Sequence, residues 1–288
     1  MLIISNKPGQ LGNRIFVFAH AIAFSIANDI KIINPSFDEY ALYFSTTYKN
    51  LLCRHPVCNN IFTGKFIRNI IYLLFYYIAV IFKKKTMQNK WVKTYSIDWS
   101  EYIDMSNHDF IEKAKSTKYI FLQGWNIRDN TNFKKYASDI RLFFRPLPKY
   151  EITITRLIQS IRSKHKIIIG VHIRQGDYIK FENGKYYYTS EEYIRQINKV
   201  IALFNIKDLS FLICSNEQQD RQLFNQIPSC YYGTGHIIED MYALSKCDYI
   251  IGPPSTFTMW ASFYGNTPLY MIKNKEYILT KNDFKLYI

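Results

Sequence analysis

The stretch GVHIRQGDY, residues 170–178, combines side chains that can bind phosphate and move protons. His172, Arg174 and Asp177 follow directly on the apolar run 167–171, which has the composition of a buried strand. The guanidinium of Arg174 is planar, permanently charged and bidentate, so it suits a diphosphate. Because side chains two positions apart on a strand share a face, we expect His172, Arg174 and Gly176 to do so. Asp177 could orient Arg174 or accept a proton; an Arg–Asp pair that only fixes a loop is the alternative.

A second polar group occurs in GPPSTFTMWASFYG, residues 252–265. A strand is expected to end at Gly252, and after two prolines Ser255 and Thr256 are expected to begin a helix. The N-terminus of a helix presents unpaired N–H groups and the positive end of its dipole, so it can hold a phosphate. The hydroxyls of Ser255 and Thr256 would add donors. An ordinary Ser/Thr helix cap is the alternative.

The third candidate is GQLGNRIF, residues 9–16, a glycine-rich turn between an expected strand and an expected helix. Gly9 and Gly12 permit a positive φ or the close approach of a ligand. The spacing differs from G-x-G-x-x-G, so the segment is no dinucleotide-binding fingerprint.

Strands and helices alternate along the chain and position these three segments. The expected strands are 1–6, 30–33, 119–122, 167–171, 209–214, 249–252 and 269–272, and the expected helices are 14–28, 131–144, 151–164, 191–204, 240–246 and 256–264. This alternation predicts an α/β fold with mostly parallel sheets. Thr189 and Glu192 have the spacing of a capping box. Ligands bind beyond the carboxyl ends of strands in such sheets, where the polar segments lie.

Pro146 and Pro148 mark the expected boundary between two domains, 1–147 and 148–288. After the boundary, strand and helix alternate four times, which indicates a doubly wound domain. The first half is expected to be a looser version of the same plan.

The charge of the chain favours anionic partners. Lys and Arg total 37 against 23 Asp and Glu, a formal net charge of +14. A basic surface suits nucleic acid, anionic lipid or a nucleoside diphosphate, and a merely solvated surface is the alternative. The five cysteines are odd in number and irregularly spaced, so neither a disulfide framework nor a metal site is expected. Reduced thiols and an N-terminus unlike a signal peptide favour the cytoplasm.

The apolar stretch Ile70–Phe82 follows Arg68 and precedes Lys83, Lys84 and Lys85. It is too short to span a bilayer, which needs roughly 20 apolar residues. Two alternatives remain: an interfacial helix with a basic anchor, or a buried core helix.

Together, the three polar segments resemble a known family. GQLGNRIFVFAHAIAFS is similar to the GGLGNQMFQYA opening of the bacterial α-1,2-fucosyltransferases of glycosyltransferase family 11, and GVHIRQGDY resembles their HVRRGDY motif. FLQGWNIRDNTNF, residues 121–133, and EDMYALSKCDYIIGPPSTFTMWASFYG, residues 239–265, resemble further segments of the family in the same order. The resemblance covers most of the chain.

The resemblance implies a GT-B-like fold, in which two Rossmann-type domains face each other across a cleft. Residues 1–147 would form the acceptor side, and residues 148–288 would bind the GDP-sugar. The enzyme would be an inverting, metal-independent galactoside 2-α-L-fucosyltransferase that moves fucose from GDP-fucose to a glycan hydroxyl, with no cofactor besides this donor. A metal-free transferase needs fixed positive charge where the diphosphate leaves.

The resemblance also assigns roles to individual residues. Those implied at the donor are Arg174, Ser255, Thr256, Phe257, Gly12 and Asn13, and those implied in catalysis are Arg174, Asp177, His172 and Asn13. Asp177 and His172 are candidates for the base, and Asn13 for positioning the acceptor. The sequence departs from the family at Gln175, where the motif has a second Arg, and at Arg14, where it has Gln.

Two alternatives stand beside this function. The first is a related transferase for another GDP-deoxysugar or linkage, and the second is a basic membrane- or nucleic-acid-binding module. No nucleic-acid-binding motif is recognisable, so no nucleic-acid partner is expected. The preferred function places the enzyme in bacterial cell-surface glycan synthesis in the cytoplasm. Peripheral contact with the inner face of the membrane through Ile70–Phe82 would suit lipid-linked glycan acceptors.

Overall fold

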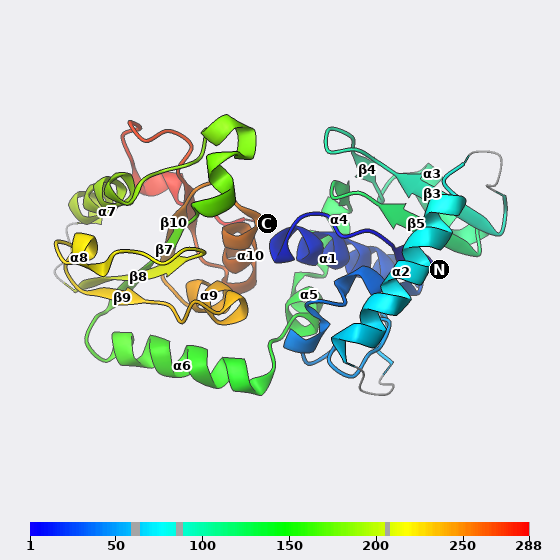
Figure 1. Ribbon diagram of the computed structural model, residues 1–288, viewed down its shortest axis with the longest axis horizontal. Helices are drawn as coiled ribbons and strands as arrows, with labels where there is room; N and C mark the ends of the chain where they lie inside the picture. Colours follow the sequence, from blue (N-terminus) through cyan, green and yellow to red (C-terminus); the bar gives the residue numbers. More distant parts are fainter. Residues whose placement is uncertain (59–63, 85–88, 205–207, 288) are drawn as a thin grey trace. The chain divides into compact units, whose positions relative to one another are not determined.

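The computed structural model describes residues 1–58, 64–84, 89–204 and 208–287. The chain divides into two compact units, Met1–Leu147 and Pro148–Ile288, which we call the N-terminal unit and the C-terminal unit. Each contains a parallel β-sheet with helices packed on it (Figure 1). The predicted α/β fold class is thereby confirmed.

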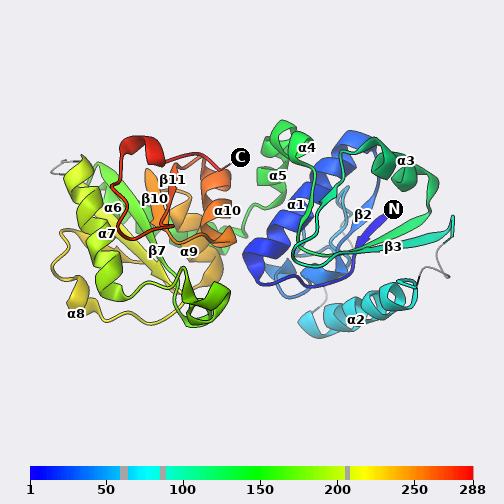
Figure 2. The same cartoon turned by 90° about the horizontal axis from the view of Figure 1, so that it is seen from above.

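The sheet of the N-terminal unit has the strand order β2-β1-β5-β3 and is parallel throughout. Its strands are β2 (Ile32–Ile33), β1 (Leu2–Ile4), β5 (Tyr119–Gln123) and β3 (Val92–Ser96). All three residues of β1 are buried, because helices cover both faces of the sheet. Helices α1 (Leu11–Asn28) and α2 (Lys65–Ile81) lie on opposite faces (Figure 2).

The segment 36–115 contains elements that the sequence pattern did not resolve. They include α2, β3 and α3 (His108–Ser116), and β4 (Ile103–Asp104) pairs in parallel with β6 (Ile127–Arg128). Short 3-10 helices, Pro35–Phe37 and Ala41–Tyr43, follow β2.

The prediction of a single helix over residues 131–144 is wrong. The segment contains two helices, α4 (Asn130–Lys135) and α5 (Ala137–Phe143). They are separated at Tyr136, whose φ of −104° and ψ of 27° are not helical. The break lets each helix direct a different aromatic ring into the core. Phe133 stacks on His20 at 4.3 Å between ring centroids, and Phe143 meets Phe18 edge-on at 5.2 Å.

The sheet of the C-terminal unit has the order β11-β10-β7-β8-β9, again with only parallel pairs. Its strands are β11 (Leu269–Met271), β10 (Tyr249–Gly252), β7 (Ile167–Ile173), β8 (Leu209–Ser215) and β9 (Cys230–Tyr232). The helices are α6 (Pro148–Arg162), α7 (Ser190–Phe204), α8 (Arg221–Phe224), α9 (Ile237–Leu244) and α10 (Thr256–Gly265). Strand β9 and helix α8 are additions to the expected elements.

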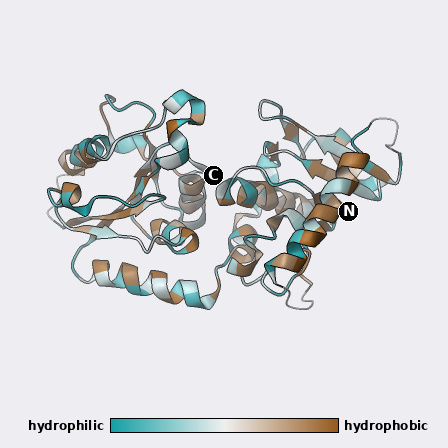
Figure 3. Ribbon diagram, viewed as in Figure 1, coloured by the Kyte–Doolittle hydropathy of each residue, from teal (hydrophilic) through white to brown (hydrophobic). Residues whose placement is uncertain are grey.

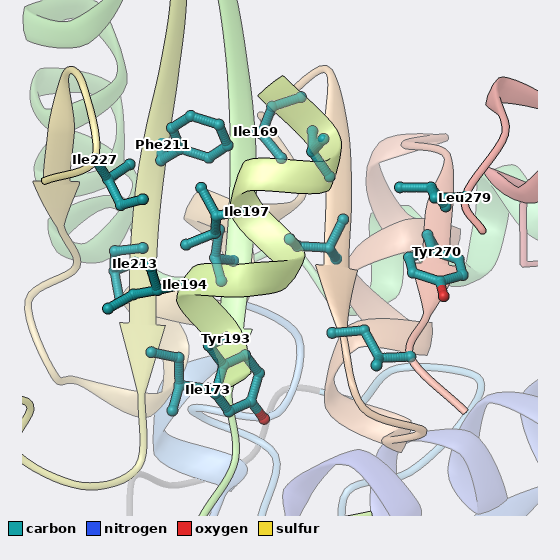
Figure 4. Close-up of a cluster of buried hydrophobic side chains, with 14 of the residues drawn as sticks. Ile169, Ile173, Tyr193, Ile194, Ile197, Phe211, Ile213, Ile227, Tyr270 and Leu279 are labelled. Atoms are coloured by element: carbon teal, nitrogen blue, oxygen red, sulfur yellow. The ribbon is translucent and has the colours of Figure 1, made fainter. Parts of the chain in front are cut away.

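The main core of the C-terminal unit lies between α7 and the sheet. Alternate residues of β7, namely Ile169, Val171 and Ile173, pack against Tyr193 and Ile197 of α7 (Figure 4). The capping box predicted for this helix is confirmed. The Thr189 N–H donates to a Glu192 carboxylate oxygen at 2.9 Å, and the Glu192 N–H donates to the Thr189 hydroxyl at 3.3 Å.

Candidate active site

The strand order places a topological switch point between β7 and β10. From β7 the chain proceeds to β8 on one side, and from β10 it proceeds to β11 on the other. Ligands of open α/β sheets bind at the carboxyl ends of strands flanking such a point. Gly252 ends β10 there, and a Cβ on it would lie 3.0 Å from the carbonyl oxygen and 3.1 Å from the Cβ of His172. The absence of a side chain at Gly252 therefore allows the two strand ends to approach closely.

His172 lies on the β7 face opposite α7 and is buried, with 2% of its surface exposed. Its ring stacks on Phe257 of α10 with 4.8 Å between centroids and 22° between planes. Burial, and then the nearby charge of Arg174, lower the pKa of His172 to about 3. Its Nδ1 atom has no hydrogen-bond partner among the described residues. A neutral imidazole of such low basicity is unsuited to act as the catalytic base. The ring is suited to form a hydrogen bond with a ligand.

Arg174 follows the end of β7 and is held in a defined position. Its backbone N–H donates to the hydroxyl of Tyr193 at 3.1 Å, and its Nη2 lies 2.8 Å from the Asp177 carboxylate. The guanidinium also lies over the Tyr178 ring, 5.5 Å from its centroid. This contact supports the role of Asp177 in orienting Arg174. The side chain of Asp177 is 51% exposed and that of Arg174 14% exposed.

The expectation that Gly176 continues the strand face of His172 and Arg174 is wrong. Strand β7 ends at Ile173, and Gly176 begins a 3-10 helix, Gly176–Ile179. Gly176 has a φ of +46°, and a Cβ there would lie 2.5 Å from Glu217 Oε1. The turn therefore needs glycine for both conformation and space.

The start of α10 borders the same switch point. Ser255 is the N-cap residue, and its hydroxyl accepts a hydrogen bond from the Phe257 N–H at 3.2 Å. The ordinary cap considered above is thus present. Tyr178 donates a 2.6 Å hydrogen bond to the carbonyl oxygen of Pro254, which fixes the loop after Arg174 to the segment before α10. This bond brings the guanidinium loop and the helix N-terminus together.

A cavity of about 470 Å³ opens at the carboxyl ends of β8 and β9. Its lining includes Ser215, Asp220, Tyr232, Thr234 and Asp240. Asp240 is only 5% exposed, and burial raises the pKa of its carboxyl to about 6. The Thr234 N–H donates to Asp240 Oδ1 at 2.8 Å.

Sequence reasoning missed Asp240 as a site residue and used it only as the start of a helix. The available signal was local: YYGTGHIIED, residues 231–240, is a glycine-containing loop that leads from a strand into a helix with an acidic first turn. A Cβ on Gly233 would lie 2.4 Å from Asp240 Oδ1, so the loop packs directly on the carboxylate.

Gly12 and Asn13 lie in the other unit, in the first turn of α1 after β1. Gly9 in the preceding loop has a φ of +56°, and a Cβ there would lie 2.3 Å from Asn13 Nδ2. Nearby, Lys7 pairs with Asp38 at 2.8 Å. Arg14 pairs with Glu39 at 2.9 Å.

The structure thus brings six of the predicted residues together and leaves two in the N-terminal unit. The six at the C-terminal switch point are His172, Arg174, Asp177, Ser255, Thr256 and Phe257. Across the described part of the chain, no group of three or more His, Cys, Asp or Glu is arranged to hold a metal ion.

Two parallel-sheet units, one with polar groups at a switch point, are typical of a Rossmann-type, GT-B-like fold. The sequence model named Glycosyl transferase family 11 matches residues 79–284, so this chain belongs to glycosyltransferase family 11 and is a glycosyltransferase. The family membership predicted from the motifs is therefore confirmed. Comparison with curated proteins finds no match.

Several solved structures share the fold at low sequence identity. The fucosyltransferase NodZ from Bradyrhizobium is 14% identical, with a TM-score of 0.54 over 96% of each chain. FUT1 from Arabidopsis thaliana, solved as a mutant in complex with GDP, is 12% identical, with a TM-score of 0.57 over 95% of this chain and 71% of that chain. POFUT1 in complex with GDP-fucose is 11% identical, with a TM-score of 0.56 over 92% of this chain and 94% of that chain.

Proposed function

We propose that this glycosyltransferase moves fucose from GDP-fucose to a hydroxyl of a glycan acceptor with inversion, forming an α-1,2 linkage without a metal ion. The observation that carries the proposal is the switch point of the C-terminal unit, where Arg174 lies on a loop fixed to the start of α10. The GDP and GDP-fucose complexes of structurally similar proteins support the choice of donor.

Stabilisation of the leaving diphosphate is the main chemical task. As the bond between sugar C1 and the β-phosphate oxygen breaks, negative charge develops on GDP, and a fixed cation with helix N–H groups can stabilise it. Arg174 would bind the diphosphate, Asp177 would orient Arg174, and buried neutral His172 could hydrogen-bond to the phosphate region. Ser255, Thr256 and Phe257 would place the first turn of α10 beside it.

The cavity around Asp240 would hold the nucleobase. Burial raises the pKa of the Asp240 carboxyl to about 6 even though the Thr234 N–H donates to its Oδ1, so this donor only partly offsets the loss of water. Guanine offers two neighbouring donors, the N1–H and the 2-amino group, whereas uracil and adenine lack that pair. The Asp240 carboxylate is therefore suited to select GDP-sugars over UDP- or ADP-sugars.

The acceptor is proposed to use the N-terminal unit, with Gly12 and Asn13 at the turn into α1. Its hydroxyl oxygen would attack C1 from the face opposite GDP through an oxocarbenium-like state. As the new C–O bond forms and the bond to the β-phosphate oxygen breaks, the hydroxyl proton would pass to a water molecule. Asp177 is engaged by the guanidinium and His172 is a weak base, so leaving-group stabilisation rather than a strong base would carry the rate. Cytoplasmic bacterial cell-surface glycan synthesis remains part of the proposal.

A second donor deserves comparison because of Gln175, which replaces an arginine of the family motif. Its amide donates to the Tyr188 carbonyl at 3.1 Å and accepts from Gln219 at 2.9 Å. The Gln175 side chain therefore forms hydrogen bonds within the C-terminal unit. Because the site then has one positive charge fewer than the family motif, a different GDP-deoxysugar is the alternative donor.

A donor panel with EDTA and Mn²⁺ arms tests the function. We expect turnover with GDP-fucose to exceed that with GDP-mannose, GDP-rhamnose and UDP-galactose, and to be unchanged by EDTA. NMR of the product should show an α-1,2-linked fucose. Preference for another GDP-sugar would replace the donor, and loss of activity in EDTA with recovery in Mn²⁺ would contradict the metal-free mechanism.

A further inference from the structure

Helix α2 of the N-terminal unit is firmly held on one side. Arg68 is 1% exposed, and its guanidinium donates to the backbone carbonyls of Thr47, Tyr48, Asn50 and Leu51 at 2.9–3.2 Å. At the other end, Ala79 is buried with Ile3, Ile33 and Phe121 of the sheet, and Phe75 and Ile78 pack against the same cluster. These contacts fix which side of the helix faces away from the sheet.

The outward side of α2 is apolar. Phe66, Ile70, Leu74, Tyr77 and Ile81 are between 50% and 77% exposed. Their spacing of three or four residues places them in one stripe along the helix. Figure 3 shows hydrophobic colouring along much of α2. Only Arg68 and Ala79 are buried in the helix, so the alternative of a buried core helix is wrong.

Positive charge frames this stripe. Lys65 begins the helix, Lys83 and Lys84 follow its end, and all three are exposed. No Asp or Glu occurs between them in the sequence. Lys85, the third predicted lysine, lies outside the described residues.

An exposed aromatic residue adjoins the strand that packs beneath α2. Trp91 precedes β3, whose first residue, Val92, packs in the cluster beneath α2, and Trp91 is 54% exposed. The amino groups of Lys90 and Lys118 lie 5.6 Å and 5.3 Å from its ring. Trp and Tyr between apolar and charged groups are typical of the interfacial zone of a bilayer.

We propose that α2 binds the surface of an anionic lipid membrane, with its apolar stripe in the acyl boundary and its lysines among the headgroups. The helix is 17 residues long, about 25 Å at 1.5 Å per residue, which is shorter than a bilayer core of about 30 Å. In the described segments, no helix is long and apolar enough to span a membrane. An in-plane position is therefore the one that suits α2.

Charge favours lipid over a second copy of the chain. In a parallel pair of α2 helices each lysine end would meet its own copy, and in an antiparallel pair Lys65 would face Lys83 and Lys84. Both arrangements bring like charges together, whereas anionic headgroups would complement them. The surface shares no residue with the proposed donor site, so this inference holds whichever donor is used.

Vesicle co-sedimentation of the full chain tests the proposal. We expect binding to vesicles with about 30% phosphatidylglycerol, weaker binding when salt rises from 0.05 M to 0.5 M, and little binding to phosphatidylcholine alone. Leu74→Glu should lower the partition coefficient at least tenfold, because it places a charge in the apolar stripe. Leu142→Glu is the matched control, since Leu142 is 67% exposed in α5 of the same unit.

Variants of the lysines test the same proposal independently in the vesicle experiment. The double variant Lys83→Gln, Lys84→Gln should lower the partition coefficient by about fivefold per lysine. The control is the double variant Lys134→Gln, Lys135→Gln, whose lysines are exposed in α4 and whose partition coefficient should not change. All variants should retain the parent's circular dichroism and melting temperature. Absent vesicle binding, or equal loss in the Leu74 and Leu142 variants, would overturn the proposal. A dimer that Leu74→Glu converts to a monomer, without vesicle binding, would assign the face to a second copy instead.

Discussion

The two units place polar groups at equivalent edges of their sheets, yet they use them differently. In the N-terminal unit, Lys7 pairs with Asp38 and Glu39 at 2.8 and 2.9 Å, and Arg14 pairs with Glu39. The Gly124 N–H also donates to Asn6 Oδ1 at 3.1 Å, which connects the ends of β1 and β5. Two cations and two carboxylates largely cancel, so this edge has little net charge to offer an anion.

The edge of the C-terminal unit keeps more capacity for a ligand. Arg174 pairs with the half-exposed carboxylate of Asp177. The Nδ1 atom of His172 has no hydrogen-bond partner in the described ranges, and Asp240 borders a cavity. Shared topology therefore does not make the two edges equivalent. The difference supports the proposal that the C-terminal unit binds the nucleotide, and four experiments test this contrast.

The largest effect is expected for Arg174→Lys. Lysine keeps the charge but loses the bidentate fork, so we expect kcat/KM for the donor to fall by roughly ten- to a thousandfold, at about 1.4 kcal/mol per factor of ten. Steady-state kinetics at saturating acceptor measures the change. Arg195→Lys is the control, because Arg195 also pairs with a carboxylate three residues away, Glu192, and is 65% exposed. Near-normal turnover by Arg174→Lys would remove Arg174 from the diphosphate site.

Asp240→Asn should weaken GDP binding by about ten- to a hundredfold, because an amide NH₂ would replace one acceptor of the guanine donors. Isothermal titration calorimetry with GDP and with IDP, which lacks the 2-amino group, measures the effect. The parent should prefer GDP, and the variant should lose most of this preference. Glu239→Gln, its neighbour in the first turn of α9, is the control. If the ratio of GDP affinity to IDP affinity were the same in the variant and the parent, guanine would bind at another site.

The pH dependence of guanosine binding gives a smaller effect. The pKa of unliganded Asp240 is raised from 3.8 to about 6 by burial, so the carboxyl is mostly protonated at pH 5 and mostly ionised at pH 7. If guanine needs the ionised form, affinity should rise about tenfold between these values. Guanosine is the probe because it has no phosphate to titrate. Asp240→Asn should flatten the curve, and an equally steep curve in that variant would exclude Asp240 as its source.

The smallest effect is expected at the N-terminal edge. Glu39→Gln should destabilise the protein by no more than about 1 kcal/mol at pH 7 and leave GDP affinity within twofold of the parent. Despite partial burial, which raises it, the pKa of Glu39 is lowered overall by Lys7 and Arg14. The stabilisation is thus present above the unfolded pKa and lost as pH falls through the lowered pKa of the folded state, so the two melting temperatures should converge in acid.

Glu112→Gln, an exposed carboxylate 3.6 Å from Lys115 in the same unit, serves as the control for Glu39→Gln and should change neither property. A large loss of GDP affinity in Glu39→Gln would show that the N-terminal edge takes part in donor binding. The contrast between the units would then fail.

Local sequence signals were sufficient to predict several elements and the family. Apolar runs indicated β7 and β10, the capping box indicated the start of α7, and the segment similar to HVRRGDY indicated the family. These signals depend on residues close in sequence, so propensity and hydrogen bonding within a few residues are sufficient to produce them.

Properties that depend on residues distant in sequence became visible in the three-dimensional structure. Helices α1 and α2 are both apolar, but α1 buries most of its residues and α2 only Arg68 and Ala79. The reason is that α4 and α5 also pack on α1, whereas the sheet and the segment after β2 contact α2 from one side. The same holds for single side chains. His172 lost its basicity through burial against Phe257, and Asp240 became a candidate ligand through the loop folded over it. Burial and dielectric environment arise from the whole fold, and residue type and spacing do not contain them.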